Sequence, residues 1–343
     1  APLRRARGAA AAAAGQSDAV DATPGAPTPR ESGDELWRQI SGNGEVTVLC
    51  VEGSELVREM RARHGTSATA GVALGRTLLG TLLLGAFKGP DEQTQVTFTG
   101  RGPLGTIKAI ATHDCQVRGL VTNPHIDLPP RADGQLNVEE AVGPGTVAVV
   151  RSHPSWKEPF TGIVQIRDGG IATDLTHYMS DSEQQNGALG LGVQVKGDGE
   201  VLGAQGYMVQ VLPFASEETL TQLEANLAAM PPPSQIAARG IRPDQVALML
   251  LEGLQPEEGY AQSFEPRYGP CCEDDIKRRM RRAVATLPPQ EVDEIFEDVG
   301  YLEVNCEFCK VSARWESQAE LDADSPVDPE EEAETDGAAP GAK

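Results

Sequence analysis

Two pairs of cysteines near the end of the 343-residue chain constrain its fold more than any other feature. Cys271 and Cys272 are adjacent, whereas Cys306 and Cys309 are separated by two residues. Tetrahedral zinc coordination requires four soft donors that converge from two chain segments, and two cysteine pairs at this spacing supply them. We therefore predict that Cys271, Cys272, Cys306 and Cys309 bind Zn²⁺.

The second pair also allows two other interpretations, a thioredoxin-like redox pair and two unrelated core cysteines. A thioredoxin pair stands at the N-terminus of a helix, which lowers the pKa of one thiol, but no helical pattern follows Cys309. The presence of the upstream pair favours zinc. Adjacent sulfurs point apart on an extended chain, so Cys271 and Cys272 can bind one zinc ion only if the chain turns there, and Gly269-Pro270 can supply that turn. Alternatively, one of the two cysteines is not a zinc ligand.

Composition and charge limit the class of protein. Hydrophobic residues make up 39% of the chain and aromatic residues only 4%, so the core must be aliphatic. The net charge of −22 repels the phosphates of a nucleic acid, and we expect no nucleic-acid partner. Six cysteines are too few for a disulfide scaffold in a chain of this length.

The two ends of the chain are expected to lie outside the fold. Residues 1–32 are a leader whose first sixteen residues contain three arginines and a run of alanines but no acidic residue, which is the composition of an organelle transit peptide. If this leader is a transit peptide, we expect the protein in the chloroplast. If it is a disordered leader without a targeting signal, we expect the protein in the cytoplasm. Residues 316–343 carry ten acidic residues against one lysine and are expected to be disordered.

Residues 68–87 are the stretch that most resembles a membrane span. An arginine such as Arg76 at the centre of a span costs about 2.5–3.5 kcal/mol, and neither an aromatic belt nor a basic loop compensates it. The four glycines of this stretch allow neighbouring backbones to approach closely. We therefore predict a buried core helix and no membrane partner.

The pattern of residues 33–214 indicates an α+β domain, in which helices are mixed with antiparallel hairpins. Helices are expected at residues 34–40, 55–63, 68–87 and 171–186. Strands are expected at residues 45–50, 93–99, 107–112, 116–122, 146–151, 160–166, 190–195 and 205–211.

Residues 215–265 are predicted to form a helical linker. Ser216 can cap a first helix that ends at three prolines, and Pro243 begins a second helix that ends near Gly253. Because these segments are apolar but interrupted, they are candidates for conditional folding. An ordinary helical connector is the alternative.

Residues 266–315 are predicted to form a small cysteine module with two helices and a strand. Residues 274–287 combine an apolar stripe with five cations, residues 290–299 continue the helical period up to Gly300, and residues 301–304 form a strand that leads into Cys306. A module of about fifty residues has too small a core to be stable alone, whereas structural zinc contributes about 10–16 kcal/mol. Loss of the metal is expected to unfold it.

Other motifs give little support for an enzyme. The glycines of residues 100–105 match a dinucleotide fingerprint by letter, but a strand pattern follows them, so a hairpin turn is the better interpretation. His113 and Cys115 would share one face of a strand while Asp114 faces the other way, which disfavours a cysteine hydrolase. The sequence contains neither a Gly-x-Ser-x-Gly elbow nor a phosphate loop. We expect no enzymatic activity.

With these residues in view, the chain resembles the heat-shock protein 33 family over nearly all of residues 34–315. The segments that carry the resemblance, in the same order as in the family, are Gly-Pro-Leu-Gly at 102–105, Glu-Pro-Phe-Thr-Gly-Ile-Val at 158–164, Ser-Glu-Gln at 182–184, Gly-Leu-Gly-Val at 190–193 and Cys-Glu-Phe-Cys at 306–309. The resemblance implies an α+β substrate-binding domain, a metastable linker and a four-cysteine zinc module. The family has Cys-x-Cys where this chain has Cys271-Cys272.

The resemblance also implies a function. Members are ATP-independent holdase chaperones whose partners are unfolded or misfolded client proteins. Oxidation forms disulfides, releases zinc and unfolds the module and linker. In this chain the disulfides would involve Cys271, Cys272, Cys306 and Cys309. A homodimer is expected in the oxidised state. Two alternatives remain, a constitutive holdase with a degenerate zinc site and a thiol-disulfide oxidoreductase. Four cysteines allow three disulfide pairings, so the connectivity stays open.

Overall fold

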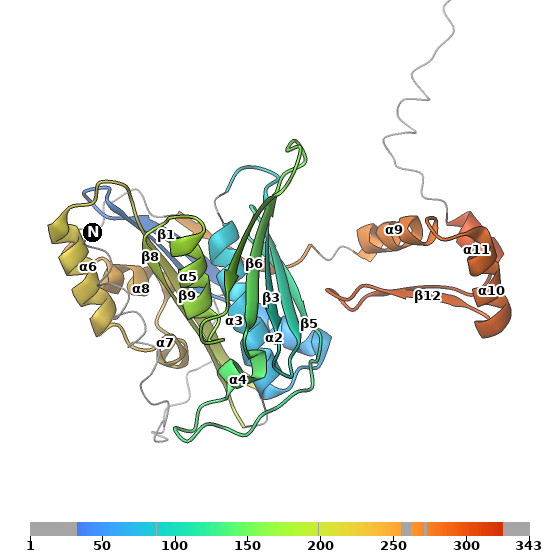
Figure 1. Cartoon of the computed structure of the whole chain (residues 1–343), viewed down its shortest axis with the longest axis horizontal. Helices are drawn as coiled ribbons and strands as arrows, with labels where there is room; N and C mark the ends of the chain where they lie inside the picture. Colours follow the sequence, from blue (N-terminus) through green and yellow to red (C-terminus); the bar gives the residue numbers. More distant parts are fainter. Residues whose placement is uncertain (1–32, 87, 198, 255–261, 271–272, 325–343) are drawn as a thin grey trace, which may run out of the picture. The chain divides into compact units, whose positions relative to one another are not determined.

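The computed structural model describes residues 33–324 apart from 87, 198, 255–261 and 271–272. The chain divides into two compact units, residues 1–270 and 271–343. Within the described residues, the larger unit contains two β-sheets with helices, and the smaller contains a β-hairpin with three helices (Figure 1). The fold is α+β, as predicted.

The first sheet has five antiparallel strands in the order β10-β1-β2-β9-β8. Every residue of β2 is buried, because helices cover both faces of the sheet at its centre. The strands are β1 (Glu35–Ile40), β2 (Val46–Glu52), β8 (Gly187–Val195), β9 (Val201–Val211) and β10 (Gln262–Phe264).

The second sheet has six strands in the order β11-β5-β4-β3-β6-β7, antiparallel except for the parallel pair of β11 and β5. Buried residues alternate with half-buried ones along β4 and β5, so this sheet has one fully covered face. The strands are β3 (Gln93–Gly100), β4 (Thr106–Thr112), β5 (Gln116–Val121), β6 (Gly145–Ser152), β7 (Phe160–Gln165) and β11 (Arg267–Tyr268).

Helix α3 (Ala68–Gly85) packs against β4 and β5 of one sheet and against β8 and β9 of the other. It is long and apolar enough to cross a membrane, yet 89% of it is buried inside the protein, which confirms the predicted core helix. A Cβ atom on Gly80 would lie 2.5 Å from Leu175 Cδ1, so this close packing depends on glycine. The neighbouring helices are α2 (Ser54–His64), α4 (Val138–Val142) and α5 (Ala172–Asp181).

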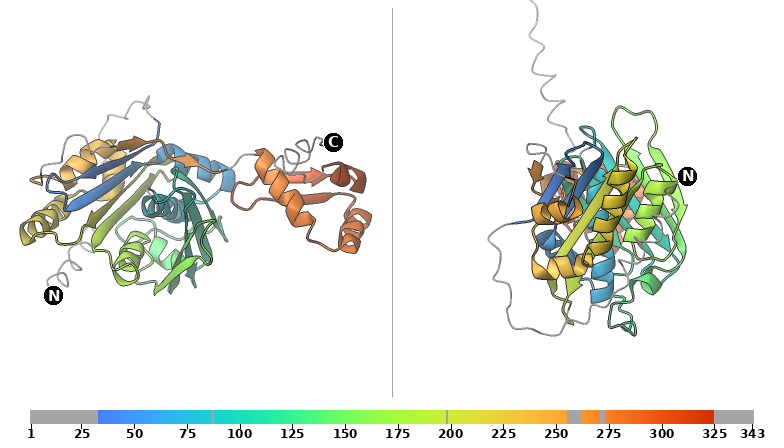
Figure 2. Two further views of the ribbon diagram at one scale, coloured as in Figure 1. Left: turned by 90° about the horizontal axis from the view of Figure 1, so that it is seen from above. Right: turned by 90° about the vertical axis from the view of Figure 1, so that its left-hand side faces the viewer.

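Three further helices cover the other face of the five-stranded sheet (Figures 1 and 2). They are α6 (Glu217–Ala229), α7 (Pro233–Arg239) and α8 (Pro243–Leu250). Ser216 caps α6 as predicted, since its hydroxyl accepts a hydrogen bond from the Thr219 amide at 3.3 Å. The predicted linker helices thus form part of the larger compact unit.

The smaller unit has its own apolar core. Its elements are α9 (Glu273–Val284), α10 (Pro289–Val299), β12 (Leu302–Asn305), β13 (Ser312–Trp315) and α11 (Gln318–Ala323). Gly300 ends α10 with a φ of 85°, as its position in the sequence predicts. The core residues are Met280, Val284, Val292, Leu302, Cys309, Ala313, Trp315 and Leu321.

Three secondary-structure predictions were wrong. Residues 34–40 were expected to be helical, but they form strand β1, because pairing with β2 and β10 overrides a weak local preference. Helix α5 ends at Asp181 rather than at Asn186. The tail was expected to be disordered from residue 316, but α11 forms there and buries Leu321. The leader and residues 325–343 lie outside the described residues.

Candidate metal centre

Cys306 and Cys309 lie in the tight turn that joins β12 to β13. The Cys306 amide donates to the Val311 carbonyl at 2.8 Å, and the Lys310 amide donates to the Cys306 carbonyl at 2.8 Å. Lys310 has a φ of 57°, which lets the chain turn back sharply after the second cysteine. The turn therefore brings both cysteines of the pair to one end of the hairpin.

The two cysteines differ in their surroundings. Cys309 is buried and disulfide-bonded, whereas Cys306 is half-buried and has a free thiol. The other predicted ligands, Cys271 and Cys272, lie outside the described residues. Across the described part of the chain, no group of three or more His, Cys, Asp or Glu side chains is placed to hold a metal ion. The structure therefore brings together two of the four predicted ligands.

Once the disulfide of Cys309 is reduced, the donor set of this turn fits zinc as far as it is described. Two cysteines separated by two residues are a common half of a tetrahedral zinc site, and thiolates are among the ligands that zinc prefers. The complete set would need two more donors. Cys271 and Cys272 directly precede α9, whose Met280 and Val284 belong to the same core as Cys309.

The two remaining cysteines are ill suited to redox chemistry. Cys50 is fully buried in β2, and burial raises the pKa of its thiol far above the usual range. Burial and the charge of Asp114 raise the pKa of Cys115 to about 11. Since the thiolate is the reactive form, both should stay reduced when Cys306 reacts.

The His113-Asp114-Cys115 segment does not form the arrangement that the sequence suggested. It lies in the turn between β4 and β5 rather than on a strand, and Cys115 has a φ of 63°. His113 Nδ1 accepts a hydrogen bond from the Asp91 amide at 3.1 Å. The prediction that His113 and Cys115 share a strand face was therefore wrong.

The glycines of residues 100–105 form the connection between antiparallel strands β3 and β4, which confirms the hairpin turn. A Cβ atom on Gly102 would lie 2.3 Å from the carbonyl oxygen of Ala141. These glycines therefore permit close backbone packing, and no helix follows them to hold a pyrophosphate.

An apolar interface joins helices α6–α8 to the five-stranded sheet. The sheet contributes Val46, Val48, Cys50, Tyr207 and Val209, all buried. The helices and the turn after them contribute Leu223, Met230, Ile236, Val246, Ala247, Leu250, Leu251 and Leu254. Hydrogen bonds also stabilise this packing: Asn226 Nδ2 donates to the carbonyl of Leu250 at 2.9 Å and to the carbonyl of Glu252 at 2.8 Å.

Two short strands connect the linker to the first cysteine pair, and the sequence did not predict them. Strand β10 pairs with β1 of one sheet, and β11 pairs with β5 of the other. The buried Tyr268 donates a hydrogen bond to the Gly119 carbonyl at 3.2 Å, and its hydroxyl lies 3.0 Å from His64 Nε2. The chain is thus fixed to both sheets just before Cys271.

Comparisons with known proteins agree with this arrangement. A family model described as Hsp33 protein matches residues 34–315. A 33 kDa chaperonin of Thermus thermophilus is 40% identical over 282 residues, which cover 80% of this chain and 82% of that protein. The 33 kDa chaperonin of Bacillus subtilis is 34% identical over 277 residues, which cover 80% and 93%.

A solved structure has the same fold. The 33 kDa chaperonin, or heat shock protein 33 homolog, of Thermotoga maritima matches with a TM-score of 0.77 and 29% sequence identity, over 85% of this chain and 97% of that one. The resemblance seen in the sequence is confirmed: the chain belongs to the Hsp33 family of chaperones.

Proposed function

We propose that this chain is a redox-activated holdase, which binds unfolded or misfolded client proteins without ATP once its cysteines are oxidised. The observation that carries the proposal is the apolar interface between α6–α8 and the five-stranded sheet. Chaperones of this kind need a large apolar surface that is covered at rest, because a surface exposed at all times would cause self-association.

The three covering helices are short, with 13, 7 and 8 residues. Isolated helices of this length are marginal in water, so these helices depend on packing against the sheet for their stability. If the packing is lost, the helices unfold and both sides of the interface become exposed. The apolar side chains of the sheet, such as Val48 and Tyr207, would then be free to contact a client.

The cysteine module supplies the trigger in this proposal. Zinc bound by Cys306, Cys309 and the upstream pair would hold the small unit folded. Two thiols and one molecule of hydrogen peroxide give one disulfide and two molecules of water, so oxidation by peroxide removes two metal ligands for each disulfide formed. The small unit would then unfold, and the covalent path from it to the covering helices runs along the chain through β11 and β10.

The test combines metal content with chaperone activity on the full chain. The reduced protein should contain one zinc ion per chain and suppress client aggregation weakly. After peroxide treatment it should release the zinc and suppress the aggregation of a thermally unfolding enzyme. Equal suppression in both states without zinc would instead support a constitutive holdase, and catalytic turnover of a dithiol substrate would support an oxidoreductase.

A further inference from the structure

Helix α9 of the small unit carries five cations, although the chain as a whole has a net charge of −22. They are Lys277, Arg278, Arg279, Arg281 and Arg282. Met280 and Val284 are buried in the core of the small unit, whereas Arg278, Arg279 and Arg282 are exposed and define the basic face of α9. Like charges three or four residues apart on a helix repel each other, so this face favours an anionic partner.

The acidic helix α10 does not supply that partner. Within the described part of the chain, no ion pair is formed by Arg279 or by the exposed acids of α10, which are Glu291, Asp293, Glu294, Glu297 and Asp298. The ion pairs of the hairpin join Arg314 of β13 to Glu303 and Glu316 instead. An anionic partner for Arg279 therefore has to come from beyond the described residues.

The chain leaves α11 directly beside α9 (Figure 1). Asp324 is the last described residue, and its backbone oxygen accepts a hydrogen bond from Arg281 Nε at 3.1 Å. Its carboxylate accepts a second hydrogen bond from Trp315 Nε1 at 2.9 Å, and Trp315 is buried in the core. These two contacts fix the point at which residues 325–343 begin, next to the basic helix.

Residues 325–343 are acidic and long enough to cover this helix. They carry one lysine and six acids, at positions 328, 330, 331, 332, 334 and 336. An extended chain spans at most about 3.3–3.6 Å per residue, so these acids can reach from about 14 Å to about 40 Å beyond Asp324. Helix α9 has 12 residues and is about 18 Å long. The acidic segment can therefore lie along the whole helix.

We propose that residues 325–343 bind the basic face of α9 in the same chain, through ion pairs between their carboxylates and the exposed arginines. A segment tethered beside its site has an effective concentration in the millimolar range, so it competes well against a free anion. A nucleic acid is a poorer occupant, because a chain with a net charge of −22 repels phosphates. This contact lies within the small unit and does not depend on the proposed holdase function.

The test measures binding of a dye-labelled peptide of residues 325–343 to the full chain at low salt, by fluorescence anisotropy. Wild type should bind the peptide weakly, because its own segment covers the face. The tail variant replaces four acids within the full chain, by Glu330→Gln, Glu331→Gln, Glu332→Gln and Glu334→Gln. It should bind the peptide about tenfold more tightly than wild type, and added salt should weaken this binding.

Two matched controls separate a contact with α9 from an effect of net charge. Asp293→Asn, Glu294→Gln, Glu297→Gln and Asp298→Asn together remove four exposed acids from α10, and this variant should bind the peptide as weakly as wild type. In the tail variant, Arg279→Gln with Arg282→Gln should weaken binding about tenfold, as expected for the loss of two exposed ion pairs. Arg101→Gln with Lys157→Gln removes two exposed cations from the large unit and should leave binding unchanged.

Three results would overturn the proposal. Equal binding of the peptide by wild type and the tail variant would show that the acidic segment does not cover the face. Equal tightening by the α10 variant and the tail variant would reduce the effect to net charge. Binding of a dye-labelled single-stranded RNA by wild type, as tight as by the tail variant and lost with Arg279→Gln and Arg282→Gln, would assign the face to a nucleic acid.

Discussion

Arg281 of α9 donates a hydrogen bond from Nε to the backbone oxygen of Leu321 at 2.9 Å, and so holds the end of α11 against the basic helix. The same nitrogen donates to the Asp324 carbonyl at 3.1 Å. The last carbonyls of a helix lack partners within the helix and carry its negative dipole end, so a guanidinium is a favourable partner there. The start of the acidic tail is therefore part of the core of the small unit.

Leu321→Ala should destabilise the small unit. The side chain is 2% exposed, and removing a buried leucine side chain costs about 2–5 kcal/mol. Hydrogen exchange of the hairpin peptides, at residues 302–315, should become faster in the reduced protein. Leu287→Ala is the control, because Leu287 is 39% exposed in the same unit. Equal exchange in the two variants would contradict a core role for α11.

Leu250→Ala should activate the chaperone without oxidation. Leu250 is fully buried between α8 and the sheet, so its truncation should weaken the packing of helices α6–α8 on the sheet by about 2–5 kcal/mol. Suppression of client aggregation by the reduced protein should rise. Leu248→Ala removes a side chain from the same helix that is 52% exposed, and the reduced variant should suppress aggregation as weakly as reduced wild type. Activation by Leu248→Ala alone would argue against the covering role of this interface.

Cys306→Ser and Cys309→Ser should each abolish zinc binding, because each removes one thiolate from a four-donor set. Cys50→Ser and Cys115→Ser should retain one zinc ion per chain, since these thiols are buried in the large unit. Elemental analysis of the reduced variants decides the matter. Full zinc content in Cys306→Ser would exclude the turn between β12 and β13 as half of the metal centre.

The contribution of Asp34 to the stability of the large unit should fall as the pH rises from about 4 to about 7. Asp34 accepts hydrogen bonds from the Glu55 amide at 2.8 Å and the Leu56 amide at 2.6 Å, but burial and the nearby Glu52 carboxylate raise its pKa from 3.8 to about 7. The folded chain therefore binds this proton more tightly than the unfolded chain. The stabilisation is complete below pH 4 and lost as Asp34 ionises, by at most about 4 kcal/mol.

Asp34→Asn tests this dependence. The difference in the free energy of unfolding between wild type and variant, from denaturant titrations at several pH values, should change between pH 4 and 7 and level off above that range. Glu59→Gln, on the exposed side of α2, is the control for loss of a carboxylate. A constant difference across this range would show that Asp34 does not titrate as its surroundings require.

Local patterns predicted the parts of the fold that depend on neighbouring residues. The cap at Ser216 and the helix end at Gly300 involve contacts within one helical turn. The Cys306–Cys309 turn is also closed by hydrogen bonds among neighbours, so its spacing could be interpreted as half of a site. Helix α7 was missed because a proline run normally marks a helix end, whereas here Pro233 occupies the first turn of the next helix.

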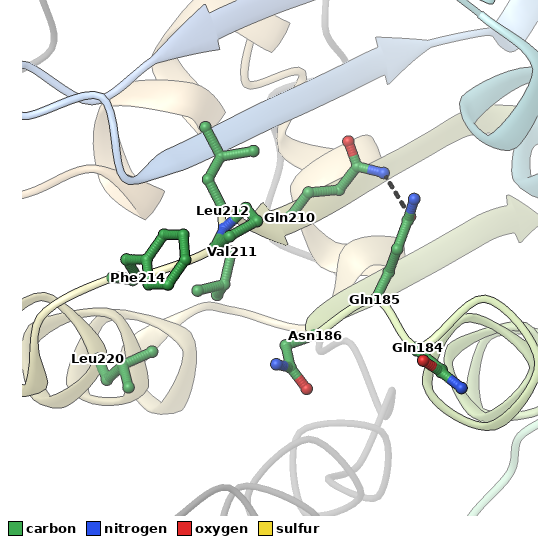
Figure 3. A pocket seen from close by; sticks show the side chains of 10 residues that line it. Gln184, Gln185, Asn186, Gln210, Val211, Leu212, Phe214 and Leu220 are labelled. Atoms are coloured by element: carbon green, nitrogen blue, oxygen red, sulfur yellow. Dashed lines mark hydrogen bonds between the residues drawn. The ribbon is translucent and has the colours of Figure 1, made fainter.

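The parts that could not be predicted depend on distant residues. Strand β1 is defined by partners on both sides, since Leu36 pairs with Val51 and with Phe264. Helix α11 is acidic, and only one of its residues, Leu321, packs in the same core as Trp315. The composition of the segment therefore gives no sign of this packing. A groove of about 440 Å³ beside Phe214 combines the loop after α5 with segments of β9 and α6 (Figure 3), and no one of these segments indicates it in the sequence.

Strands β10 and β11 have a consequence for the order of events in any unfolding. The peptide that leaves α8 is paired first with an edge of one sheet and then with an edge of the other before it reaches Cys271. Disruption that begins at the sulfurs must detach both edges in turn before it can pull on α8. In the proposed mechanism, these two strands would therefore slow the spread of unfolding from the cysteines to the helices, because two separate strand pairings must break first.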